Sequence, residues 1–413
     1  MNFENKQELY KVSESTKKMQ VWKGWTEGEE VFCEWGELGG KMQQKVYTAE
    51  PKNICRSNET SATQQAKIEL AAMYQSQIDN KHYKLSQIDA IESSEVCRIP
   101  RKITNYKDRF DKMSDILLTS VKLNGSRACV VDGLLYSKIG RHEEIKVDHL
   151  REAVEKLGKV NFDSEVYAHG LSLQRIRSAW LKPIKTDKEI IKIANGRAKK
   201  KKSDAKFKTL TQAVEYLGYH PNEDAPKLKF HVFDIPDDTG KSFKDRLEDL
   251  HYLQSVVISC GCESLFEFIY PKQTNSHEER MCLLEDVHAK GYEGLVHYEP
   301  DGLYEYGKRS TNTAKSKPRM DAEAKVMSIT KDKNCEGVLH CMASDELDNV
   351  EFKCKMKVER RDGNRYERDY ESMLSLVGKW ITFSYEELSD TGTPTKPVGE
   401  CERECDEQGR PLE

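Results

Sequence analysis

The stretch SVKLNGSRACVVDG, residues 120–133, places a lysine, an Asn-Gly pair and an arginine between two apolar, β-prone runs. Asn124 and Gly125 are typical of a tight turn between strands, because both residue types tolerate backbone conformations that other residues avoid. Lys122 comes just before this turn and Arg127 just after it. A plain hairpin needs no such cations, so the stretch raises the question of whether Lys122 is a nucleophile or a surface lysine.

Composition indicates a globular protein of several domains. The 413 residues exceed one typical domain, and charged and hydrophobic residues make up 33% and 37% of the chain. No run approaches the roughly 18 apolar residues of a membrane span, and the N-terminus has no apolar signal core. We therefore expect a cytoplasmic protein with no membrane partner. The twelve cysteines lack the paired spacings of a zinc site and are expected to be reduced thiols.

Residues 1–85 are expected to form a small α+β domain. Short alternating runs broken by glycines and acidic turns predict an antiparallel sheet, and the segment that follows predicts a helix. The segment WGELGG, residues 35–40, resembles the tryptophan-glycine-arginine (WGR) domain of some DNA-repair proteins, with Glu37 in place of the arginine. This resemblance implies that the first domain binds DNA.

The rest of the chain divides into three ranges. Residues 86–115 are polar without sustained periodicity, which predicts a linker and the beginning of the next domain. From 116 to 322 the pattern alternates between strands, such as KLKFHVFDI and GLVHY, and helices, such as DHLREAVEKLG, FKTLTQAVEYLG, SFKDRLEDLHYLQSV and HEERMCLLEDVHAKG. Residues 323–413 hold about five short strand candidates, which predict a small β-barrel with an oligonucleotide-binding (OB) fold as the leading option. The fold class expected for the whole chain is α+β.

Five segments carry a resemblance to a known superfamily. In chain order they are KLNGSR (122–127), NFDSEVYAHG (161–170), KLKFHVFDIP (227–236), GYEGLVHY (291–298) and YGKRSTNTAKSKPRMDAEA (306–324). A lone K-x-x-G-x-R is common by chance, whereas five segments in this order are specific. The series resembles the motif set of the covalent nucleotidyltransferases, most closely the ATP-dependent DNA ligases of bacteriophages. This implies an adenylation domain of antiparallel sheets with helices over residues 116–322. The segment VGKWITFSYEELSDTGTPTKP (377–397) resembles the OB domain that follows it in such ligases.

The resemblance implies that Lys122 attacks the α-phosphorus of ATP and forms a lysyl-AMP. A lysine must be neutral to attack, and nearby cations lower the pKa of an ammonium group. Lys315 and Lys317 are two residues apart and would share one face of a strand. We expect them to lower the pKa of Lys122 and to bind the α-phosphate. Glu293 resembles the glutamate of the family's metal site, which would hold Mg²⁺.

Other site residues follow from the same resemblance. Arg127 would contact the ribose, and Glu165 would accept hydrogen bonds from its hydroxyls and add a second carboxylate at the metal site. Phe230 is expected to stack on adenine, with Phe233 as the alternative. Lys138 stands where many ligases have arginine and would bind a phosphate as a point charge. Taken singly, these residues would be surface lysines, solvated carboxylates and core aromatics, and only the order of the motifs favours their functional roles.

Two residues depart from the family pattern. Asn124 replaces the expected aspartate, and this replacement keeps the shape of the side chain and loses its charge. Ser120 stands where cellular DNA ligases often have a glutamate that reads adenine. We expect an ATP-dependent DNA ligase, a monomer that seals 5′-phosphate/3′-hydroxyl nicks in duplex DNA with ATP and Mg²⁺, in the host cytoplasm if a phage encodes it. An RNA-end ligase and a non-catalytic protein that binds nucleic-acid ends remain the alternatives.

A basic block lies between Lys182 and Lys208. It holds eleven lysines and arginines against three acidic residues, a net charge of +8 in a chain whose total is −4. Such a block is usually a solvated segment, but beside a catalytic site it attracts phosphates. We expect sequence-independent contacts to DNA phosphates here.

Overall fold

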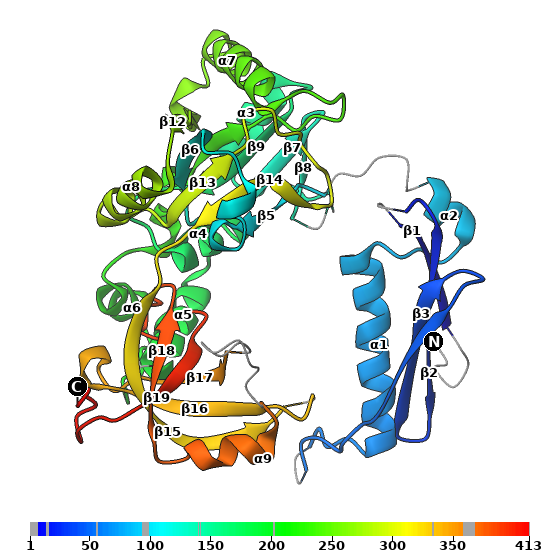
Figure 1. Ribbon diagram of the computed structural model, residues 1–413, viewed down its shortest axis with the longest axis vertical. Helices are drawn as coiled ribbons and strands as arrows, with labels where there is room; N and C mark the ends of the chain where they lie inside the picture. Colours follow the sequence, from blue (N-terminus) through cyan, green and yellow to red (C-terminus); the bar gives the residue numbers. More distant parts are fainter. Residues whose placement is uncertain are drawn as a thin grey trace.

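The computed structural model describes residues 7–13, 16–54, 57–92, 99–138, 140, 142–200, 203–332, 334–357 and 368–412. These residues form three units: an N-terminal sheet with one long helix, a central unit of two sheets, and a C-terminal barrel (Figure 1). Within the described ranges, none of the helices combines the length and apolar character needed to cross a membrane.

The N-terminal unit is the small antiparallel sheet that the sequence predicts. Its four strands pair in chain order and are β1 (Gln7–Val12), β2 (Met19–Glu27), β3 (Glu30–Glu37) and β4 (Met42–Thr48). Helix α1 (Ala62–Lys81) packs on this sheet and begins at a capping box formed by Ser61 and Gln64. Leu9, Trp22 and Leu70 are buried between them. A short helix, α2 (Gln87–Glu92), packs against β1.

The central unit consists of two five-stranded sheets. The first has the order β11-β10-β9-β7-β8, with β7 (Ser126–Val131), β8 (Leu134–Tyr136), β9 (Phe162–Tyr167), β10 (Lys229–Asp234) and β11 (Phe266–Phe268). The second has the order β12-β6-β13-β14-β5, with β5 (Lys102–Asn105), β6 (Leu117–Lys122), β12 (Lys272–Thr274), β13 (Gly294–Tyr298) and β14 (Arg309–Ser316).

The stretch 120–133 connects these two sheets. Strand β6 belongs to one sheet and β7 to the other, so the turn at Asn124 and Gly125 carries the chain between them and closes no hairpin. Gly125 is required at this crossing, because a Cβ there would lie 2.4 Å from the Val166 carbonyl oxygen. The turn therefore places Lys122 at the junction of the two sheets.

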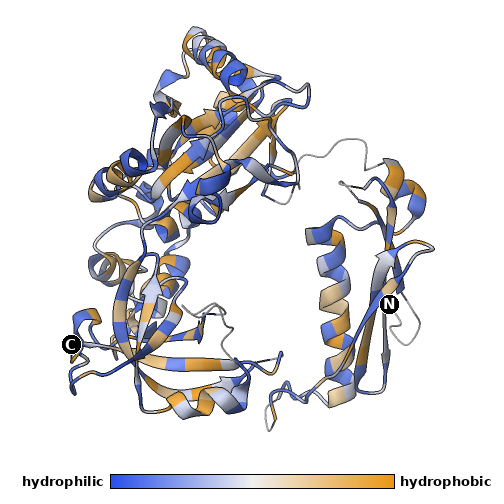
Figure 2. Cartoon of the chain, in the orientation of Figure 1, coloured by the Kyte–Doolittle hydropathy of each residue, from blue (hydrophilic) through white to orange (hydrophobic). Residues whose placement is uncertain are grey.

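Helices cover the sheets of the central unit. Helix α4 contacts β7 and β9, α7 contacts β10 and β11, and α8 contacts β13. The helices are α3 (Asp148–Leu157), α4 (Leu173–Leu181), α5 (Asp187–Lys200), α6 (Leu210–Leu217), α7 (Phe243–Ser259) and α8 (His277–Ala289). Apolar residues are frequent on the strands, whereas the helices mix apolar and polar residues, as expected for elements with one solvated face (Figure 2). The four predicted helices and two predicted strands of this region are present.

Strand β5 lies within the range that the sequence analysis assigns to a linker. It pairs in parallel with β14, with Thr104 opposite Ala314. Residues Lys102–Asn105 therefore belong to the second sheet and not to a linker. A strand of four residues is too short to show a clear alternation of apolar and polar residues, so the sequence pattern does not indicate it.

The C-terminal unit is a closed barrel with the order β15-β16-β17-β19-β18. Its strands are β15 (Met320–Lys331), β16 (Gly337–Ala343), β17 (Glu351–Met356), β18 (Trp380–Tyr385) and β19 (Val398–Arg403), with the short helix α9 (Tyr370–Met373) packed against β15 and β16. Phe383, Ile381 and Leu339 are fully buried inside it. This confirms the predicted α+β architecture with a five-stranded, OB-like barrel.

Gly294 provides a test of how tightly the second sheet is built. A Cβ at this position would lie 2.1 Å from the Ser316 carbonyl oxygen, so we expect Gly294→Ala to force β13 and β14 apart and lower the free energy of unfolding by about 2–4 kcal/mol. Gly196, inside α5, has open space around its Cβ position, and Gly196→Ala should be neutral or gain roughly 0.5–1 kcal/mol. Denaturant unfolding of both variants measures the contrast, and equal effects would contradict it.

Candidate active site

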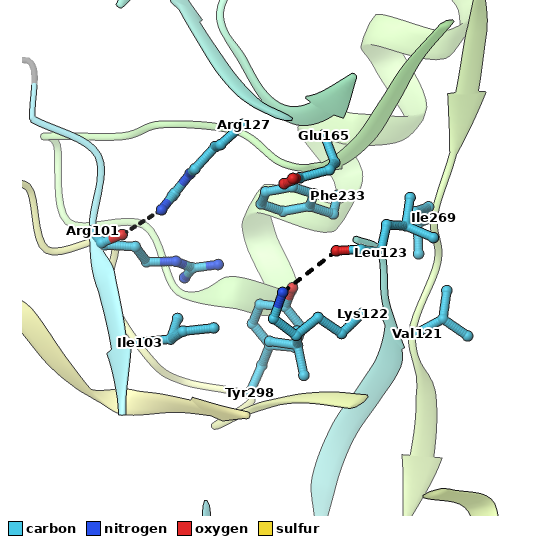
Figure 3. Close-up of a pocket in the computed structure, with 11 residues that line it drawn as sticks. Arg101, Ile103, Val121, Lys122, Leu123, Arg127, Glu165, Phe233, Ile269 and Tyr298 are labelled. Carbon is cyan, nitrogen blue, oxygen red and sulfur yellow. Dashed lines mark hydrogen bonds between the residues drawn. The ribbon is translucent and has the colours of Figure 1, made fainter. Parts of the chain in front are cut away.

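A pocket lies where the two sheets of the central unit meet. Its polar lining includes Lys122 from β6, Arg127 from β7 and Glu165 from β9, and Phe233 from β10 supplies an aromatic ring (Figure 3). Arg127 and Glu165 are direct partners in the pairing of β7 with β9, which places the two side chains next to each other. Residues separated by more than a hundred positions in the sequence thus line one pocket.

The Glu293 carboxylate joins two lysines at the edge of this pocket. One of its oxygens accepts a hydrogen bond from Lys122 Nζ, and the other forms an ion pair with Lys317 Nζ. The three side chains are between 13% and 20% exposed, so solvent screens these charges only partly. In this arrangement one carboxylate holds the side chains of both lysines in place.

Lys315 and Lys317 have different environments although they are two residues apart. Burial lowers the pKa of Lys315, and the nearby cations Lys317 and Lys122 lower it further. Burial alone would also lower the pKa of Lys317, but Glu293 and Glu386 outweigh it and raise that pKa. The structure therefore brings both expected lysines close to Lys122, with Lys317 the more strongly paired of the two.

Glu165 is a carboxylate whose proton affinity is shifted by its surroundings. Burial raises the pKa of Glu165 to about 7, although Lys122 and Arg127 oppose the shift. Arg127 itself is anchored on the other side by Asp163, through Nε at 2.9 Å and Nη2 at 2.5 Å. Arg127 Nη1 donates to the Arg101 carbonyl oxygen at 2.6 Å. The guanidinium is therefore fixed in orientation at the pocket wall.

The expectation that Phe230 stacks on adenine is wrong. Phe230 is fully buried, and its ring packs between Phe162 and Phe266 with centroid distances of 5.2 and 5.3 Å. Side chains alternate along β10, so Phe230 faces the core while Phe233, an odd number of residues away, faces the pocket. The aromatic ring available to a ligand is that of Phe233.

Lys138 also differs from the expectation. It lies exposed in the turn after β8 and is not among the described residues that line the pocket.

Two groups of residues in the site were missed by the sequence analysis. Arg101 lines the pocket with a side chain only 2% exposed, pairs with Asp234 at 2.6 Å, and lies about 5 Å from the rings of Tyr298 and Tyr304. It falls in the range predicted to be a linker, and an isolated arginine there carries no periodic signal. Glu386 and Glu387 reach the site from the barrel, and no local pattern indicates that contact.

Two carboxylates of the site are candidates for holding a metal ion. Across the described ranges, no group of three or more histidine, cysteine, aspartate or glutamate side chains is placed to hold a metal ion. Mg²⁺ usually binds through one or two carboxylates together with substrate phosphates and water. Glu293, whose oxygens already hold cations, and Glu165 fit that requirement.

Comparison with known proteins identifies the family. Residues 99–317, more than half of the chain, match the family model described as the ATP dependent DNA ligase domain. The chain therefore belongs to the ATP-dependent DNA ligases and is an enzyme of that class. Among curated proteins, none matches this sequence.

Solved structures support the same fold. A structure from a study of Lig E DNA ligases, described as binding DNA with a minimal scaffold, has a TM-score of 0.54 and 22% identity, over 75% of this chain and 100% of that chain. The structure called Pmar-Lig_PreS3 has a TM-score of 0.52 and 14% identity, over 74% of this chain and 68% of that one. The Chlorella virus DNA ligase-adenylate is 20% identical, over 75% of this chain and all of that one, with a TM-score of 0.40. At these identities the first two likenesses concern the fold alone.

The shifted pKa of Glu165 makes a prediction about stability and pH. Because the pKa in the folded state, about 7, lies above the ordinary value of 4.5, the folded protein keeps a proton that the unfolded chain releases. The contribution of Glu165 to stability is therefore present below pH 4.5 and is lost as the pH rises through 7. Glu165→Gln lacks this loss and should gain stability over the parent between pH 5 and pH 8, on the order of 3 kcal/mol.

Thermal unfolding of both proteins at several pH values measures this difference. Glu267→Gln, which removes an exposed carboxylate from β11, is the matched control and should track the parent. A difference between parent and Glu165→Gln that does not change with pH would show that Glu165 has no raised pKa.

Proposed function

We propose that this protein seals 5′-phosphate/3′-hydroxyl nicks in duplex DNA through an adenylated Lys122. The observation that carries the proposal is the meeting of Lys122, Arg127, Glu165 and Phe233 at one pocket, with Glu293 against Lys122 beside it. These residues come from four separate segments that resemble ligase motifs. A nucleophile, a diol acceptor, an aromatic ring and a metal-site carboxylate are the parts that nucleotide transfer requires.

The reaction that these residues support has three transfers. Neutral Lys122 Nζ attacks the α-phosphorus of ATP, so that a nitrogen–phosphorus bond forms and pyrophosphate leaves. An oxygen of the DNA 5′-phosphate then attacks the same phosphorus and releases the lysine. Finally the 3′-hydroxyl attacks the activated 5′-phosphate, the phosphodiester bond forms, and AMP leaves with the electron pair of the broken bond.

Residues of the pocket would hold the nucleotide. The Phe233 ring would stack on adenine, and Arg127 and Glu165 would hold the ribose, where a carboxylate accepts hydrogen bonds from both hydroxyls of the diol. Lys315 and Lys317 would bind the phosphates. Mg²⁺, held by Glu293 with Glu165 nearby, would offset the negative charge of the phosphates.

Lys122 must lose a proton before it attacks. In the described arrangement Lys122 Nζ donates a hydrogen bond to the Glu293 carboxylate. A cation that draws the carboxylate away would break this contact and leave Lys122 Nζ free to approach the α-phosphorus. Glu293 thus links the position of the nucleophile to the charge present in the phosphate site.

The proposal extends to the N-terminal unit. We infer that residues 1–85 form a WGR-like DNA-binding domain, and that the protein is a monomeric ligase of the bacteriophage type. The support is the resemblance of WGELGG, which lies on β3 and the turn after it, where Glu37 pairs with Lys18 at 2.9 Å.

The proposed role of Lys122 as the nucleophile is tested by replacing it with alanine. We expect ATP labelled on the α-phosphate to transfer its label to the protein, and Lys122→Ala to reduce the label to background because Lys122 is the one lysine among the described residues that line the pocket. Lys272→Ala, which removes an exposed lysine from β12, should label normally. Label that persists in Lys122→Ala would place the nucleophile elsewhere.

The same assay separates the alternatives. A parent protein that takes no label from ATP would be the non-catalytic binder of nucleic-acid ends. An RNA-end ligase, which the loss of the family aspartate at Asn124 favours, would label but seal nicked RNA in preference to nicked DNA. Nick sealing with matched DNA and RNA duplexes measures that preference.

The basic block is in part structural. Lys185 is buried and donates to the carbonyl oxygens of Ser178 and Lys182, and Arg197 pairs with Asp390 at 2.6 Å. Lys199 and Lys200 are exposed at the end of α5, whereas Lys201 and Lys202 lie outside the described residues. We propose that Lys199 and Lys200 contact DNA phosphates.

Changing both lysines to glutamine should therefore weaken nicked-duplex binding and reduce its salt dependence. Each lost phosphate contact lowers the slope of log affinity against log salt by about 1, so we expect a change of about 2. Label transfer from ATP should stay close to that of the parent. The pair Lys272→Gln and Lys290→Gln, exposed lysines outside the block, is the control. Equal salt slopes for all three proteins would make the block a solvated segment.

A further inference from the structure

One loop of the barrel makes three polar contacts with the central unit. It comprises residues 386–390, directly after β18, and is called the docking loop here. Each contact sets a carboxylate of the loop against a donor of the central unit: Glu386 with Lys317 at 2.9 Å, Glu387 with Asn124 at 2.7 Å, and Asp390 with Arg197 at 2.6 Å. The loop thus connects the barrel to the turn that carries Lys122.

The contact with Asn124 explains the departure from the family pattern. Asn124 Nδ2 donates a hydrogen bond to the Glu387 carboxylate, and both side chains are partly buried. A carboxylate accepts hydrogen bonds and cannot donate them, so an aspartate at 124 would set two like charges within hydrogen-bonding distance. The neutral amide at 124 is therefore required by its partner in the barrel.

Glu386 is held as a charged group by two cations. Its carboxylate accepts hydrogen bonds from Lys317 at 2.9 Å and from Lys396 at 2.7 Å. Burial alone would raise the pKa of Glu386, but the hydrogen bonds from Lys396 and Lys317 bring it down to about 2. An anion of this chain consequently lies on a lysine to which we assign an ATP phosphate.

We propose that Asn124 is a positioning residue that holds the docking loop on the central unit, and that Glu386 there occupies Lys317 in the place of a phosphate oxygen until ATP displaces it. The second half of this proposal rests on the proposed function of the pocket. The first half does not, because the loop contacts exist whatever the pocket binds.

Competition for Lys317 follows from charge. Lys317 already pairs with Glu293, and a phosphate added beside Glu386 would lie next to two carboxylates. The repulsion would make the docked loop and the bound triphosphate exclude each other at this lysine. The apparent affinity for ATP is then the intrinsic affinity multiplied by the fraction of molecules in which the loop is not docked.

The first experiment measures domain arrangement in the full-length protein without nucleotide. Small-angle X-ray scattering would compare the parent with Asn124→Asp, Glu387→Gln and the double variant. We expect Asn124→Asp to increase the radius of gyration, because the loop is repelled. Glu387→Gln should match the parent, since two amides can still form a hydrogen bond. The double variant should return to the parent value, because the new amide donates to the new carboxylate.

The matched control is Asn58→Asp, which adds the same charge in an exposed turn of the N-terminal unit. It should leave the radius of gyration unchanged. If Asn124→Asp scatters like the parent, or if Glu387→Gln does not restore it in the double variant, the contact does not hold the loop and the proposal is overturned.

The second experiment measures the ATP dependence of single-turnover adenylation. Glu386→Gln removes the competing charge, and we expect the apparent KM for ATP to fall about three- to tenfold. A fall of this size corresponds to a parent protein in which the loop is docked in most molecules. An unchanged or higher KM would overturn the competition with phosphate. If the parent takes no label from ATP at any concentration, the proposed function fails, while the scattering result still decides whether Asn124 positions the loop.

Discussion

The contacts of the Glu293 carboxylate with Lys122 and Lys317 are the interaction on which the rest of the site depends. One carboxylate, set at the start of β13, accepts a hydrogen bond from Lys122 of β6 and pairs with Lys317, which follows β14. These three strands are neighbours in one sheet, so backbone pairing brings the charges together before any ligand arrives. Charges that are largely withdrawn from water are stable only when paired, which makes the position of Glu293 a constraint on both lysines.

The junction between the two sheets is supported by a second set of buried charges. Asp234 pairs with Arg101 at 2.6 Å and with Arg246 at 2.8 Å, while Asp163 holds Arg127 and accepts a hydrogen bond from Tyr304 at 2.7 Å. These groups belong to β7, β9, β10, α7 and the segments before β5 and β14. A network of this kind fixes the pocket wall, since moving one member leaves another buried charge without its partner.

The central unit and the barrel interact through charges of the same kind as those that would bind substrate. Lys317 contacts Glu386 of the barrel as well as Glu293, and Arg197 of the basic block contacts Asp390. Anionic nucleotide and DNA would compete with these carboxylates for the same cations. In that case the binding of phosphate ligands would be coupled to the arrangement of the central unit and the barrel.

Sequence alone was sufficient for the main architecture and for most of the charged residues of the site. Periodicity and turn residues predict the N-terminal sheet, the helices α3, α6, α7 and α8 of the central unit, and the barrel, because these depend on local alternation. The order of five motifs indicates Lys122, Arg127, Glu165, Glu293, Lys315 and Lys317, which the fold then brings close together. Tertiary structure decided the rest. Phe233 faces the pocket and Phe230 the core because the sheet has one buried face, and the sequence does not say which face that is. Arg101, Glu386 and Glu387 reach the site only because strands far apart in the sequence pair and because the barrel packs beside the central unit. Asn124 shows the limit most clearly, since it reads as a lost charge in the sequence and becomes a hydrogen-bond donor only when Glu387 is beside it.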